Sequence, residues 1–66
     1  MNDTAQHQEA KWLAQRFNFK PAPVLKWMEA NNIQDVLGLR GHFPNTEHAE
    51  TMRLTREAIE DFIFSN

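Results

Sequence analysis

The sequence predicts an all-α domain in which four short helices surround one hydrophobic core. Three observations predict it. Apolar residues recur at helical spacing through most of the chain, and no segment alternates apolar with polar residues as a half-buried strand would. Proline, asparagine and glycine fall between the apolar stripes, where helices start and stop. The 66 residues contain no repeat and no linker-like stretch, so we expect a single domain over residues 1–66.

A first helix is predicted from about Thr4 to Phe17. Asp3 or Thr4 could cap its start, because a short side-chain oxygen can accept a hydrogen bond from a free backbone N–H. Asn18 could end it, since asparagine tolerates the left-handed conformation that often follows a helix. Trp12 is expected to cover the edge of the buried stripe, which consists of Ala10, Leu13, Ala14 and Phe17.

A second helix is predicted over 21–31 and a short third helix over 34–39, with Ile33 filling the core between them. Pro21 suits the first turn of a helix, where its missing N–H would have no partner. Gly38 and Gly41 are expected to end the third helix. The buried side chains should be Val24, Trp27 and Met28 in the second helix, and Val36 and Leu37 in the third.

A final helix is predicted from a cap at Asn45 or Thr46 to about Phe64. The alternative is a winged helix, in which residues 43–54 form a short β-hairpin and a shorter helix starts at Thr55. The polar, helix-favouring run EHAETMR favours the helix. The whole predicted core is Leu13, Phe17, Val24, Trp27, Val36, Leu37, Met52, Ile59 and Phe62.

The composition limits the possible functions. Cysteine is absent, which excludes disulfides and fits a reducing cytoplasm. The three histidines, at positions 7, 42 and 48, lack metal-ligand spacing, so we expect no metal and no other cofactor. There is no signal-peptide pattern and no run of the ~20 apolar residues that span a membrane. A soluble, cytoplasmic protein without a membrane partner is therefore expected.

The short chain also predicts self-association. A domain of this size buries only roughly 60% of the surface that its unfolded chain exposes, so its core is marginal. Since disulfides and metals are not expected here, oligomerisation is the remaining means of stabilisation. We therefore expect a homodimer.

No residues form a catalytic pattern. Glu47 and His48 are adjacent in sequence and so project in different directions from a helix. Nothing resembles an activated nucleophile, and the two glycines are too few for a phosphate-binding loop. The chain is not expected to be an enzyme or to take a small-molecule substrate.

Charge is distributed unevenly around a net charge of −2. Residues 1–43 carry five basic and four acidic side chains, whereas residues 44–66 carry two basic and five acidic ones. Such asymmetry allows a basic face to act locally despite the net charge. It could equally provide two surfaces that attract each other in a dimer.

The most informative segment is 10–28, AKWLAQRFNFKPAPVLKWM, which contains basic residues and no acidic one. Its pattern predicts two short amphipathic helices joined by a tight turn. The segment resembles the helix-turn-helix family of bacterial and phage regulators, which has a small residue in the first helix, a turn residue with positive φ four positions later, and two buried residues three apart in the recognition helix. The matching residues here are Ala14, Asn18, Val24 and Trp27.

The resemblance implies a small DNA-binding transcription regulator, phage- or plasmid-borne, that acts as a dimer by occlusion or recruitment at an operator. Residues 21–31 would be the recognition helix. Lys20 and Lys26 could reach phosphates or guanine edges, with Lys11 and Arg16 on the backbone. Because no Arg, Asn or Gln lies centrally on that face, we expect little sequence specificity. The predicted DNA-binding residues are Lys11, Arg16, Lys20, Ala22, Leu25, Lys26 and Glu29.

The C-terminal segment 52–63, MRLTREAIEDFI, is similar to the last helix of small winged-helix excisionases. It also supports an alternative function, that of a protein-interaction module or inhibitor that binds a host or partner protein. An exposed apolar patch here would mark an interface, and its predicted residues are Ile59, Phe62, Ile63 and Phe64. In the alternative, Ile59, Phe62 and Ile63 close the core and only Phe64 is exposed.

Overall fold

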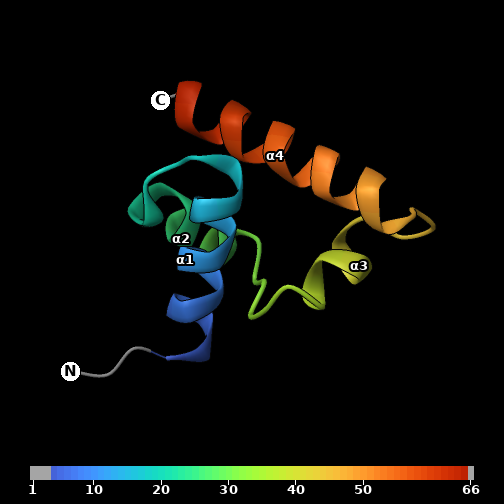
Figure 1. Ribbon diagram of the computed structural model, residues 1–66, viewed down its shortest axis with the longest axis horizontal. Helices are drawn as coiled ribbons and strands as arrows, with labels where there is room; N and C mark the ends of the chain where they lie inside the picture. Colours follow the sequence, from blue (N-terminus) through green and yellow to red (C-terminus); the bar gives the residue numbers. More distant parts are fainter. Residues whose placement is uncertain (1–3, 66) are drawn as a thin grey trace.

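The computed structural model describes residues 4–65, which form four helices joined by loops and contain no strand. In chain order the helices are α1 (Ala5–Phe17), α2 (Pro21–Ala30), α3 (Gly38–His42) and α4 (His48–Phe64). Helices α1 and α2 pack side by side, and α4 runs across them and reaches α3 with its first turns (Figure 1). The all-α prediction is confirmed. No helix of the described chain combines the length and apolar character needed to cross a membrane.

Helix α1 begins and ends where its sequence signals predict. The Thr4 hydroxyl accepts a hydrogen bond from the His7 N–H at 3.2 Å and caps the start. Asn18 has φ 64°, in the left-handed region, and the following Phe19 N–H donates to the Ala14 carbonyl at 2.8 Å. Asp3, the other predicted cap, lies outside the described residues.

The left-handed Asn18 gives a direct test of this helix end. Glycine adopts positive φ without a Cβ clash, whereas alanine is strained there. Asn18→Gly should raise the free energy of unfolding by a few tenths to about 1 kcal/mol, and Asn18→Ala should lower it by about 1 kcal/mol. Urea unfolding of the two variants and the wild type measures both changes. Equal stabilities of the two variants would contradict the assigned backbone conformation.

Helix α2 confirms the predicted start at Pro21 and buries the predicted stripe of Val24, Trp27 and Met28. It ends at Ala30, one residue earlier than predicted, and the left-handed Asn32, with φ 59°, turns the chain out of the helix. The Asn31 backbone N–H and side-chain amide both donate to the Trp27 carbonyl, at 3.1 and 2.8 Å. Ile33 is buried, as predicted.

The predicted position of the third helix, residues 34–39, is wrong: α3 lies at Gly38–His42. Residues before it form a turn, because the Asp35 carboxylate accepts from the Gly38 N–H at 2.9 Å and the Glu9 carboxylate accepts from the Val36 N–H at 2.8 Å. The turn directs Leu37 outwards, with 74% of its surface exposed, and Leu39 fills the core instead. Both glycines lie inside this short helix rather than after it.

The last helix starts later than predicted, at His48, and neither Asn45 nor Thr46 is its cap. Asn45 has φ 65°, and the Thr46 hydroxyl donates to the Phe43 carbonyl at 2.8 Å, so both residues belong to the preceding loop. The alternative hairpin over 43–54 is wrong, because these residues form a short loop and the first turns of α4.

The core confirms most of the predicted residues. Leu13, Phe17, Val24, Trp27, Met52 and Ile59 are buried, Val36 and Phe62 pack partly buried at the edge, and Leu37 is excluded. Two threonines of α4 are also buried, and each hydroxyl bonds a carbonyl one turn earlier: Thr51 to Glu47 at 3.0 Å and Thr55 to Thr51 at 2.7 Å. Threonine is therefore accommodated in this core without an unsatisfied polar group.

Candidate nucleic-acid interface

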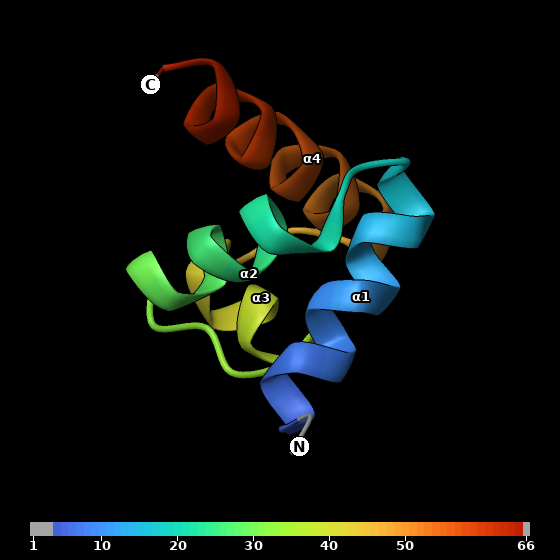
Figure 2. The same cartoon turned by 90° about the vertical axis from the view of Figure 1, so that its left-hand side faces the viewer.

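The outer face of α2 is open to solvent. Figure 2 shows α2 in front, with α1 beside it, α3 behind it and α4 above it. Because α2 turns Val24, Trp27 and Met28 inwards, the stripe on its opposite side consists of exposed residues at i, i+4 and i+7. These residues are Ala22, Lys26 and Glu29.

The joint between α1 and α2 has the features that the spacing predicted. Ala14 is buried, which allows close approach of the helices, and Asn18 takes the positive φ at the turn. Val24 and Trp27 are buried in α2. The loop over 18–20 is short, and α2 packs directly against α1.

The predicted basic residues are all exposed. Lys20 and Lys26 make no ion pair within residues 4–65, and the Arg16 guanidinium carbon lies 5.9 Å from the centroid of the Trp12 ring. The four cations do not share one stripe. Lys26 lies on the outer face of α2, Lys20 immediately precedes that helix, and Lys11 and Arg16 lie on α1.

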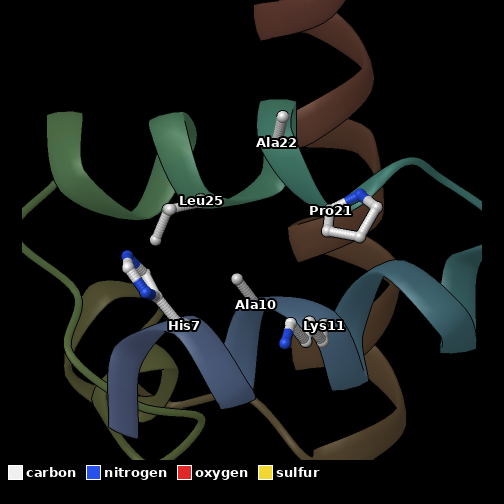
Figure 3. A pocket seen from close by; sticks show the side chains of 6 residues that line it. All are labelled: His7, Ala10, Lys11, Pro21, Ala22 and Leu25. Carbon is white, nitrogen blue, oxygen red and sulfur yellow. The ribbon is translucent and has the colours of Figure 1, made fainter. Parts of the chain in front are cut away.

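A shallow cavity of about 190 Å³ is lined by residues of both α1 and α2. Figure 3 shows His7 and Leu25 facing each other across it, with Lys11 and Pro21 towards its other end. Leu25 was predicted to point outwards with the DNA-binding residues; it is half-buried and faces α1, because it lies at the edge of the buried stripe. The lining residues are His7, Ala10, Lys11, Pro21, Ala22 and Leu25.

Helix α4 gathers the negative charge. Arg53 pairs with Glu50 at 3.7 Å and with Glu57 at 3.0 Å, and Arg56 pairs with Glu60 at 3.6 Å. Both arginines of α4 are thus engaged within their own helix, while Glu47 and Asp61 add further negative charge. These carboxylates lie apart from α1 and α2, and Glu29 is the one exposed carboxylate on that pair of helices.

The predicted C-terminal interface is reduced to Phe64, of which 81% is exposed. Ile59 is fully buried, so its assignment to an exposed interface is wrong: it faces the core on the inner side of α4. Phe62 and Ile63 are half-buried against that core.

Trp12 is the functional candidate that the sequence interpretation missed. It was expected to cover the edge of the core, yet 45% of its surface is exposed. A signal was present: its neighbours three and four positions away are Gln8, Glu9, Gln15 and Arg16, all polar. A core-facing residue would have apolar neighbours at these spacings.

Comparison with protein-family models, curated proteins and solved structures found no match to this chain. Within residues 4–65 no group of three or more metal-ligating side chains is placed to hold an ion.

Proposed function

We propose that this chain is a small regulatory protein that binds DNA through the α1–α2 pair. The observation that carries the proposal is the separation of charge. Four exposed cations and one exposed carboxylate, Glu29, lie on α1, on the loop before α2 and on α2, whereas α4 carries two arginines and four carboxylates. A local basic surface attracts phosphates even when the net charge is negative.

The geometry of α2 supports a docking mode. A ten-residue helix is about 15 Å long, and the major groove, about 12 Å wide, admits an α-helix. With the outer stripe of α2 in the groove, Lys26 reaches phosphate, while Lys20, Lys11 and Arg16 contact the flanking backbone. Ala22 and Glu29 provide no bidentate reader of guanine or adenine, so binding discriminates little between sequences.

Binding of a labelled duplex of mixed sequence tests this proposal. Three or four lysine or arginine contacts to phosphate predict an affinity that falls about 40- to 150-fold between about 50 and 200 mM salt, because counterions are released from the DNA. Fluorescence anisotropy measures the affinity at each salt concentration. Absence of binding at the lower salt concentration, or an affinity independent of salt, would contradict the proposal.

A second candidate function, binding of a protein partner or a second copy through α4, is supported by the exposed Phe64 on an acidic helix. Exposed large apolar side chains mark interfaces when they form a patch. Here Phe62 and Ile63 contribute only partly to such a patch, since they pack on the core. The DNA-binding proposal therefore accounts for more of the surface.

A further inference from the structure

Trp12 lies on the side of α1 that faces away from the core. The helix buries Ala10, Leu13, Ala14 and Phe17, and at 100° per residue Trp12 falls on the opposite side. We call this side the outer stripe of α1; it consists of Gln8, Lys11, Trp12, Gln15 and Arg16.

Packing does not explain the tryptophan at this place. Trp12 is 45% exposed, whereas the other tryptophan, Trp27, is buried in the core. Tryptophan is enriched where a protein surface meets a partner, because one flat ring offers a large contact area at low entropic cost. The position of Trp12 therefore indicates a ligand that is not part of this fold.

Trp12 lines two surface depressions. One, of about 540 Å³, is lined by Trp12 together with Lys11, Gln15 and Phe19 among others, and a second, of about 370 Å³, is lined by Trp12, Gln15 and Arg16. Lys11 also lines the cavity between α1 and α2. The outer stripe is thus continuous with the surface that we propose for DNA.

Charge identifies the class of ligand. Glu9 is the only carboxylate in α1, and it is half-buried and accepts the Val36 N–H at 2.8 Å. The outer stripe itself carries two cations, two amides and no carboxylate. A flat aromatic ring between Lys11 and Arg16 matches a nucleobase with a phosphate on either side, because bases stack on aromatic side chains while cations hold the backbone.

We propose that Trp12 stacks on an unpaired base and that the outer stripe of α1 binds single-stranded nucleic acid. This inference rests on the proposed function and names a substrate preference for it. Bases inside a duplex are already stacked and present no face to a side chain, so Trp12 favours a single strand or a locally opened one. The guanidinium carbon of Arg16 lies over the Trp12 ring, 5.9 Å from its centroid, and so adds a planar cation to the site.

The test compares an oligothymidylate of about ten nucleotides with a duplex of equal length, using wild type, Trp12→Ala and Trp12→Phe. Loss of one stacked base should weaken single-strand binding about 5- to 150-fold in Trp12→Ala. Trp12→Phe should retain most of the affinity, since it keeps an aromatic ring. Duplex affinity, measured at the same salt concentration, should change less than the single-strand affinity.

Tryptophan fluorescence gives a second readout. Stacking on a base should quench the exposed Trp12, while the buried Trp27 retains its emission and reports that the fold is intact. In Trp12→Ala the quenching by oligothymidylate should disappear.

The outcomes separate this inference from the proposed function. If Trp12→Ala binds the single strand as tightly as wild type, or loses single-strand and duplex affinity equally, the stacking site is overturned and duplex binding stands. If wild type binds neither nucleic acid at low salt, the proposed function fails and the inference fails with it. Loss of self-association in Trp12→Ala, with unchanged nucleic-acid affinity, would assign Trp12 to a protein interface and also overturn the inference.

Discussion

Replacing Lys20 and Lys26 together by glutamate should lower duplex affinity on the order of 100-fold at about 50 mM salt. Each lysine that neutralises a phosphate contributes about 0.9 to the slope of log affinity against log salt, so the slope should become shallower by about 1.8. Neither lysine makes an ion pair within residues 4–65, and both are exposed. The double variant should therefore keep its helical circular dichroism and its unfolding midpoint.

A matched control separates a local contact from a general charge effect. Lys26→Glu on α2 and Arg40→Glu on α3 change the net charge by the same amount, and both side chains are exposed. Helix α3 lies behind α2 in Figure 2, away from the proposed surface. We expect Lys26→Glu to weaken binding clearly more than Arg40→Glu. Equal losses would mean that the whole molecule, rather than the α1–α2 pair, attracts the DNA.

Ile59→Ala should destabilise the domain by about 2–5 kcal/mol, because a fully buried branched side chain leaves a cavity when it is shortened. Ile59 lies on the inner side of α4, the helix that contacts both α2 and α3. A chain of this length has a total stability of roughly 3–10 kcal/mol, so the loss is a large part of it. Urea unfolding followed by circular dichroism measures the change.

Phe64→Ala is the control for this prediction, since it removes a larger side chain that is 81% exposed. It should change the free energy of unfolding by less than about 0.5 kcal/mol at low protein concentration. If its effect matched that of Ile59→Ala and grew with protein concentration, Phe64 would be buried in an oligomer, which would favour the second candidate function.

Local signals predicted helices α1 and α2, because each has an apolar stripe and strong boundary residues. Thr4, Asn18 and Pro21 act through bonds or dihedral restrictions within a few residues of themselves. The third helix could not be placed in this way. Its start depends on Glu9, which bonds Val36 from 27 positions away, and Gln6 similarly donates to the Ile33 carbonyl at 2.9 Å.

The candidate site was predictable in its charges but less so in its shape. Lys11, Arg16, Lys20 and Lys26 are exposed, as an uninterrupted basic segment implies. The inward turn of Leu25 and the outward place of Trp12 were not anticipated, although the polar neighbours of Trp12 indicated the latter.

The order of residues by itself determined the helical class, the ends of α1, the start of α2 and the location of the positive charge, because each depends on contacts or periodicity over a few positions. Tertiary packing decided the rest. It chose Leu39 over Leu37 for the core and placed α3 at Gly38–His42. These choices depend on how helices distant in the chain share one small core, and that competition for burial has no local signal.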